Sequence, residues 1–217
     1  MNILLQIQEA PKEFELTIFD LLMKGGVIMI PIFLLLLIAT YFSIERYLFL
    51  RQVTKRKPEF IPTIRKHLQD GDIKAANLYA DHETSATGKV ISTGLQFVGK
   101  PYKEIESVLE SSANIQIAHM EENLGILGII AGVAPMLGFI GTITGIIRIF
   151  YTISLADNIS IGIIAGGLYE KMITSGSGLV VGVIAFIAYH LLHLKIQKFA
   201  LGIQEDTLEF LRVINTK

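Results

Sequence analysis

The sequence predicts an all-α membrane protein with three transmembrane helices and long helical extensions outside the bilayer, assembled into a homo-oligomeric ring. Hydrophobic residues make up 51% of its 217 residues and charged residues only 18%, against about 25% in soluble domains. The apolar residues gather in three runs, each long enough to supply the ~20 residues that cross a bilayer. Two of these runs also contain polar side chains, which favours their burial against other copies of the chain.

The three apolar runs define the spans. The first span covers residues 25–50, and its apolar part ends just before Glu45. The second covers residues 124–154 and the third residues 161–194. At about 1.5 Å per residue, the third run is longer than a hydrocarbon core of roughly 30 Å. We therefore expect it to continue into water as a helix over residues 195–217.

Basic residues predict the orientation of the spans. Lysine and arginine are frequent after the first span, whereas residues 155–160, between the second and third spans, contain neither. Because basic residues favour the cytoplasmic side, we expect residues 1–24 and 155–160 on the outer side, and residues 51–123 and 195–217 in the cytoplasm. The basic residues that follow the apolar part of the first span are Arg46, Arg51, Lys55, Arg56, Lys57, Arg65 and Lys66.

The segments outside the bilayer are expected to be helical. Residues 1–24 predict an amphipathic helix along the outer membrane surface. In residues 51–123, Asp72 can cap the helix that follows it, and Pro101 stands where another helix can begin. Nothing in the sequence interrupts that helix before Leu124, so we expect it to run straight into the second span. The whole segment is small for a core of its own, and we expect it to pack on the extended span ends and on neighbouring subunits.

Composition and motifs disfavour several function classes. A net charge of −1 provides no basic surface for nucleic acid, and the absence of cysteine excludes disulfides and thiolate metal sites. His190 and His193 have no evident third metal ligand. The glycines of "GSGLVVG" lack the spacing of a dinucleotide loop, and no serine, histidine and aspartate arrangement suggests nucleophilic catalysis. We therefore expect no enzyme activity, no metal and no cofactor.

Glu170 is the residue that most needs an explanation. An ionisable side chain near the bilayer centre costs roughly 2.5–3.5 kcal/mol and usually faces a bundle interior or a hydrated cavity. Counted from Ile161, Glu170 lies about 14 Å into the third span, close to mid-membrane, and Thr174 and Ser177 share its face. It could take up and release a proton as its surroundings change. The alternative is a structural residue that pairs with another helix.

Lys171 directly follows Glu170 in the chain. Adjacent residues of a helix point about 100° apart. On that ground we expect that Lys171 is not the partner of Glu170, and that it needs another acid or extends toward the membrane surface.

Small residues at four-residue spacing predict close helix packing in the second and third spans. Gly141 and Gly145 form one such pair, and Gly178 and Gly182 form another. The first span, rich in leucine and isoleucine, has no central polar group and suits contact with lipid. Three spans are too few to enclose a hydrated path, so we expect a ring with the second and third spans inside.

The motifs of all three spans resemble those of the MotA/TolQ/ExbB proton channel family, and most closely its ExbB/TolQ branch. The first span resembles the branch in "GGVIMIPI" followed by "ERYLFL", the second in "APMLGFIGTITGIIRIF", and the third in "GGLYEKMITSGSGLVVG". The likeness extends over nearly the whole chain, including the order of the spans and the long segment between the first two.

The resemblance implies a multi-pass protein of the bacterial inner membrane that moves protons without a cofactor. Its subunits would form a pentamer around the single membrane helices of an ExbD/TolR-type partner, in contact with membrane lipids and a TonB-like protein. By position, Glu170 matches the third-span glutamate of the family, Thr142 its second-span pore threonine and Ser175 its third-span pore threonine, for which Thr174 is a substitute one place earlier. Lys171 stands where the family commonly has a small residue.

The resemblance implies an ExbB-like subunit that energises TonB-dependent transport across the outer membrane, with a central cavity lined by Glu170, Thr142 and Ser175. Two alternatives remain within the family: a TolQ-like subunit of the Tol-Pal system, or a gliding or secretion motor. A third reading from another class is a membrane scaffold that conducts no ions and recruits partners through residues 51–123.

The predicted orientation can be tested in this cysteine-free chain. Single cysteines at Asn158 and Asp70 should react with a membrane-impermeant maleimide from opposite sides, with Asn158 labelled in cells whose cytoplasmic membrane is intact. Labelling of Asp70 under the same conditions would contradict the orientation.

Overall fold

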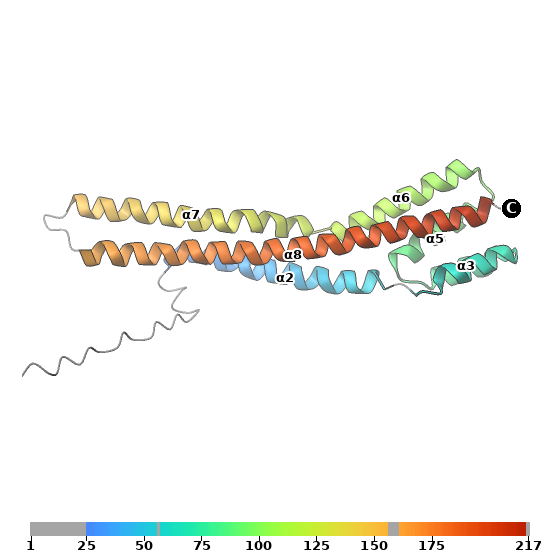
Figure 1. Ribbon diagram of the computed structural model, residues 1–217, viewed down its shortest axis with the longest axis horizontal. Helices are drawn as coiled ribbons and strands as arrows, with labels where there is room; N and C mark the ends of the chain where they lie inside the picture. Colours follow the sequence, from blue (N-terminus) through green and yellow to red (C-terminus); the bar gives the residue numbers. More distant parts are fainter. Residues whose placement is uncertain (1–24, 56, 156–160, 216–217) are drawn as a thin grey trace, which may run out of the picture. The chain divides into compact units, whose positions relative to one another are not determined.

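The computed structural model describes residues 25–55, 57–155 and 161–215, and all regular secondary structure within these ranges is helical. Figure 1 shows these helices along the chain. The predicted all-α fold is confirmed. The helices are α2 (Met29–Val53), α3 (Phe60–Gln69), α4 (Ile73–Asp81), α5 (Ala86–Leu95), α6 (Tyr102–Glu121), α7 (Leu124–Ser154) and α8 (Ile161–Asn215).

Three of these helices, α2, α7 and α8, are long and apolar enough to cross a membrane. They coincide with the three predicted spans, and the chain is a multi-pass membrane protein. α2 begins four residues later than the predicted span, because Gly25 and Gly26 precede the helix and Gly26 has a φ of +73°. α8 is one unbroken helix through the predicted end of the third span. The predicted interfacial helix of residues 1–24, and most of the connection 155–160, lie outside the described residues.

The chain divides into two compact units. One contains the described residues up to Leu34 together with Pro135–Val180, and the other contains Leu35–Ala134 and Val181–Lys217. Each of the three long helices therefore contributes to both units. In α7 the boundary falls at Pro135, which has no N–H to donate to the carbonyl four residues earlier.

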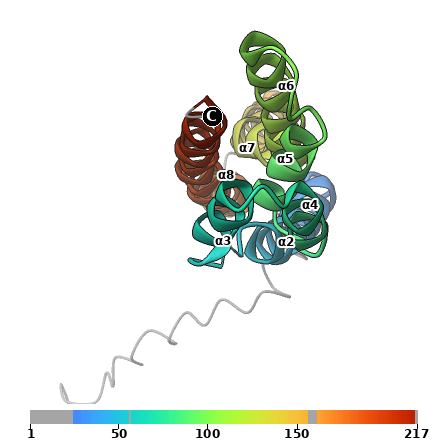
Figure 2. The ribbon, with the colours of Figure 1, turned by 90° about the vertical axis from the view of Figure 1, so that its right-hand side faces the viewer.

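The second unit has an apolar core built by α3 to α6 and by the C-terminal part of α8. Consecutive helices contact each other from α3 to α6, and Figure 2 shows α3 and α4 side by side. A Cβ on Gly94 of α5 would lie 3.0 Å from Cε1 of Phe210 on α8, so the two helices approach closely there. The sequence predicted that this segment packs on an extended span end, and α8 of the same chain provides that surface. Fully buried members of the core include Phe60, Ile64, Ile91, Leu95, Ile105, Leu109, Met120, Ile196 and Phe210.

The predicted cap of α4 is confirmed. The Oδ1 atom of Asp72 accepts a hydrogen bond from the backbone N–H of Ala75 at 2.9 Å. Asp72 thereby satisfies one of the N–H groups that have no partner inside the helix. Ser85 caps α5 in the same way, through the backbone N–H of Gly88.

The prediction of one continuous helix through residue 124 is wrong. α6 ends at Glu121, and Asn123 has a φ of +60°, a left-handed conformation that asparagine tolerates better than most residues. The break leaves carbonyl groups of the last turn of α6 without helical partners. Arg46 of α2 donates from Nη1 to the carbonyl oxygen of His119 at 3.2 Å, so a contact from a distant part of the chain supports this helix end.

The core of the second unit predicts the effect of one truncation. Leu109 is completely buried, so Leu109→Ala should lower the free energy of unfolding by about 2–5 kcal/mol through lost burial and a remaining cavity. Leu78→Ala makes the same change at a side chain that is 65% exposed and serves as the control. Chemical unfolding of the purified protein in detergent measures both, and equal effects would contradict the described core.

Candidate functional site

Polar side chains of the first unit gather where α8 meets the residues that precede α2. A Cβ on Gly26 would lie 3.1 Å from Oε1 of Glu170, so the carboxylate lies directly against this backbone. Gly26 has a positive φ, which side chains with a Cβ rarely adopt. The side chain of Glu170 remains 40% exposed in the single subunit. Glu170 thus has a fixed backbone neighbour on one side and accessible space on the other.

Lys171 is the ionic partner of Glu170, and the expectation that adjacent residues do not pair is wrong. Its Nζ donates to Oε1 of Glu170 at 2.6 Å, and its side chain is only 17% exposed. The 100° between the two Cβ directions is overcome by the length and flexibility of the lysine stem. The stem lies where a Cβ on Gly145 of α7 would be, so the missing side chain of Gly145 leaves room for Lys171.

Thr174 connects α8 to the start of the first span. Its hydroxyl donates to the carbonyl oxygen of Gly25 at 2.8 Å and also lies 3.2 Å from the carbonyl oxygen of Glu170. The residue is 1% exposed. The sequence proposed Thr174 as a substitute pore residue. In this subunit its hydroxyl is committed to backbone carbonyls, so Thr174 positions the residues around it.

The contact line between α7 and α8 is called the α7–α8 seam here, and its residues are Gly138, Gly141 and Gly145 on α7 and Lys171 and Thr174 on α8. A Cβ on Gly138 would lie 3.0 Å from the backbone oxygen of Ser175. A Cβ on Gly141 would lie 2.7 Å from Cγ2 of Thr174. The two backbones are therefore close together. The order of these contacts along the two helices shows that α7 and α8 run antiparallel.

Gly178 and Gly182, the second predicted pair of small residues, are both buried on α8. Gly178 belongs to the first unit and Gly182 to the second.

Thr142 and Ser175 lie on the same side of the α7–α8 seam. Each follows a seam residue by one position: Thr142 follows Gly141, and Ser175 follows Thr174. One step turns a right-handed helix by about 100°. Seen from one end of the pair, a step along α7 rotates in one direction and a step along α8 rotates in the other, because the helices are antiparallel. The side chains of Thr142 and Ser175 therefore point to the same side of the helix pair. Both residues are half-buried, and the Thr142 hydroxyl donates to the Gly138 carbonyl oxygen at 3.0 Å.

Glu170 lies on the opposite side of the α7–α8 seam, because it precedes Lys171 by one position instead of following it. Ser175 comes five positions after Glu170, which corresponds to about 140° around the helix axis. Glu170 and Ser175 therefore point in different directions from α8, and a cavity lined by Glu170, Thr142 and Ser175 stays a prediction. Thr142 and Ser175 form one polar side, and Glu170 forms another beside the start of the first span.

The depth predicted for Glu170 stays a prediction, and the structure places the residue relative to the neighbouring helices. The count of about 14 Å from Ile161 holds along α8. However, Glu170 contacts Gly26, which comes before the first residue of α2, and α7 continues nine residues beyond Gly145 to Ser154. Glu170 is therefore level with the start of α2, and nine residues of α7 lie beyond it.

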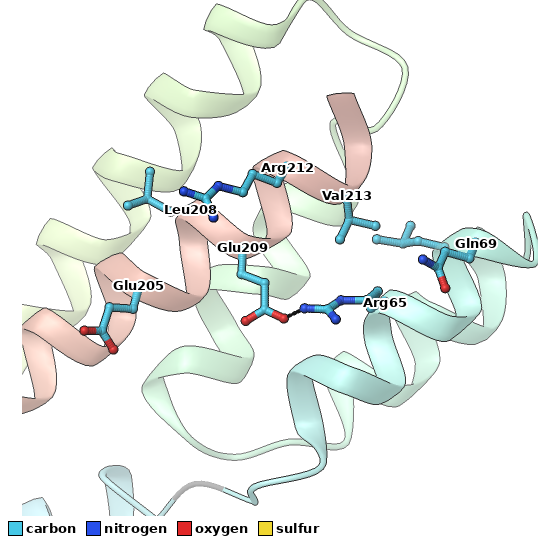
Figure 3. A pocket seen from close by; sticks show the side chains of 8 residues that line it. Arg65, Gln69, Glu205, Leu208, Glu209, Arg212 and Val213 are labelled. Atoms are coloured by element: carbon cyan, nitrogen blue, oxygen red, sulfur yellow. Dashed lines mark ion pairs between the residues drawn. The ribbon is translucent and has the colours of Figure 1, made fainter. Parts of the chain in front are cut away.

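Histidines and cavities of the second unit do not form a comparable cluster. His193 Nδ1 lies 3.8 Å from Oε1 of Glu121, and no group of three potential metal ligands occurs among the residues that the structure describes. A groove of about 760 Å³ lies between α3 and the end of α8, where Arg65 forms an ion pair with Glu209 (Figure 3). Two arginines and two glutamates line this groove, so it has no excess of either charge.

A sequence model described as the MotA/TolQ/ExbB proton channel family matches residues 82–205. The matched range is longer than half of the chain. It contains Thr142, Glu170 and Ser175, so both polar sides of the α7–α8 seam fall within it.

Three curated relatives illustrate the similarity. The putative biopolymer transport protein ExbB-like 1 of Synechocystis is 26% identical over 190 residues, which cover 84% of this chain and 75% of the relative. The putative biopolymer transport protein ExbB homolog of Methanothermobacter thermautotrophicus is 29% identical over 175 residues, covering 80% of this chain and 62% of the relative. The Tol-Pal system protein TolQ of Haemophilus influenzae is 29% identical over 103 residues, 48% of this chain and 43% of the relative.

The geometry of the α7–α8 seam predicts the effect of a larger side chain. Gly141→Leu should separate the helices, because even its Cβ would collide with Thr174. We expect a lower melting temperature and a weaker oligomer in native mass spectrometry. Gly132→Leu is the control on the same helix, since a Cβ there meets nothing within 4 Å. An oligomer equally stable in both variants would contradict the packing argument.

Proposed function

Because this chain belongs to the MotA/TolQ/ExbB proton channel family, we propose that it is the ion-conducting stator subunit of a motor driven by the proton motive force in the bacterial inner membrane. The observation that carries the proposal is the carboxylate of Glu170 within an apolar helix hairpin, in contact with Gly26. An ionisable group in such a hairpin is costly and usually belongs to an ion path.

We further propose a pentameric ring of this subunit around the membrane helices of an ExbD/TolR-type partner. Thr142 and Ser175 support this arrangement, because hydroxyls on one side of the α7–α8 seam need a polar or protein neighbour in a membrane. The first span gives the arrangement a second support, because its surface suits lipid. Large apolar side chains that are more than half exposed line α2 and suit lipid: Ile30, Leu34, Leu37, Tyr41, Ile44, Tyr47 and Leu48.

The proposed orientation places the end of the α7–α8 hairpin, and therefore Glu170, toward the periplasm. The distribution of lysine and arginine supports it. A proton that crosses a potential of ~150 mV releases about 3.5 kcal/mol. That energy is enough to drive a mechanical step between the ring and its partner. Glu170, at the periplasmic end of the first span, is where a proton would be taken up.

The role that we favour is to energise TonB-dependent outer-membrane transport. The relatives named ExbB-like and ExbB homolog support it, whereas the relative named TolQ supports a Tol-Pal role. The neighbouring genes distinguish the two, since a TonB-like gene beside one for a single-span partner favours the first role. A scaffold without conduction remains the alternative from another class.

The proposal predicts that Glu170→Gln preserves the ring and abolishes conduction. The amide is nearly isosteric with the carboxyl but cannot carry a proton, so proton flux into liposomes containing the ring and its single-span partner should fall to the level of protein-free liposomes. Glu205→Gln, the same change at an exposed position of α8, is the control. An intact ring with normal flux in Glu170→Gln would refute the role of Glu170.

A further inference from the structure

Lys171 carries an inference that goes beyond the function of the family. It is a cation in place of the small residue that the resemblance leads us to expect, and its Nζ lies 2.6 Å from Oε1 of Glu170. Its side chain is less exposed than that of Glu170, 17% against 40%. The lysine is therefore the more enclosed member of the pair, and the carboxylate of Glu170 has one accessible side.

The position of Lys171 is built by the fold. A Cβ on Gly145 would overlap the Cγ, Cδ and Cε atoms of the lysine, so only a glycine on α7 leaves space for this stem. A Cβ on Gly26 would lie 3.7 Å from Nζ. Residues of α7 and of the segment before α2 therefore both confine the lysine, and its contact with Glu170 does not depend on a freely moving surface side chain.

Among the residues that the structure describes, few other charges surround this pair. On α7, the seam residues Gly141 and Gly145 are uncharged, and Arg148, one turn further on, has an exposed side chain. On α8 the neighbouring titratable residue is Tyr169, which is half-buried. Before α2, Gly25 and Gly26 are uncharged, and Lys24 lies outside the described residues. Lys171 is thus the cation that the structure brings into contact with Glu170.

We propose that Lys171 is a tethered counter-ion of Glu170 that closes the carboxylate to the transported cation until the lysine leaves its position on Gly145. This inference rests on the proposed role of Glu170 in an ion path. A proton that binds Glu170 removes the acceptor of the ammonium, and an unpaired charge in a partly dry seam is costly. The site then has two states: lysine in place with an ionised carboxylate, and lysine displaced with a protonated one.

Such a counter-ion would restrict passive leak through the subunit. A carboxylate without the ammonium would be open to any proton that reaches it from the accessible side. With Lys171 in place, proton binding requires an additional step, in which the lysine finds another acceptor or water. Uptake is then coupled to a movement of the seam or of a partner.

Lys171→Met tests the proposal with the least change in packing, because methionine keeps an unbranched stem over Gly145 and removes the charge. Infrared spectra of the full chain in lipid nanodiscs at neutral pH should show a protonated-carboxyl band in Lys171→Met that the unaltered protein lacks. The band should disappear in Glu170→Gln/Lys171→Met, which assigns it to Glu170. Lys171→Arg, which keeps the charge, should restore the unaltered spectrum.

Proton flux through liposomes that contain the full chain alone provides the second measurement. We expect Lys171→Met to leak roughly tenfold faster or more, given the usual strength of a charge-assisted hydrogen bond. Gly145→Ala should increase both the intensity of the protonated-carboxyl band and the rate of proton leak, because the Cβ of the alanine displaces the lysine stem. Absence of the band in folded Lys171→Met protein would overturn the proposed role of Lys171 as a counter-ion. A band without faster leak would support the pairing and count against the conducting role of Glu170, which separates the two proposals.

Discussion

The close contact between α7 and α8 is the constraint on which the polar site depends. Gly141 and Gly145 bring α7 so near to α8 that a Cβ at either position would collide with Thr174 or Lys171. In a membrane no hydrophobic force draws two apolar helices together, so packing through small residues and hydrogen bonds must hold them. A larger residue in the α7–α8 seam would displace the two residues that position Glu170.

The α7–α8 seam also separates two kinds of polar surface. On one side, Thr142 and Ser175 offer hydroxyls and no charge. On the other, Glu170 lies beside the backbone of Gly26 and pairs with Lys171 of the seam. This division follows from antiparallel packing of two right-handed helices, because a step forward and a step backward along the chain lead to opposite sides.

The unbroken course of α8 connects these features to the rest of the chain. The helix that carries Glu170 continues to Phe210, which is buried in the core of the second unit. A second link starts in α2, where Arg46 donates to the carbonyl of His119 at the break between α6 and α7. Elements of the membrane spans thus take part in the core of the second unit, which explains how so short a segment between the first two spans can be folded.

The sequence by itself determined the three spans, the cap at Asp72 and the singular position of Glu170, because apolar length, a capping side chain and a charge within an apolar run act locally. Only the tertiary structure decided the helix break at Asn123, the pairing of Lys171 and the commitment of the Thr174 hydroxyl. Each of these depends on a neighbour far away in the chain: an arginine that supports a helix end, a glycine that leaves room for a lysine stem, and a backbone carbonyl that accepts a hydrogen bond. The distances between such partners depend on how the packed helices are staggered. The spacing of residues along one helix does not predict these distances.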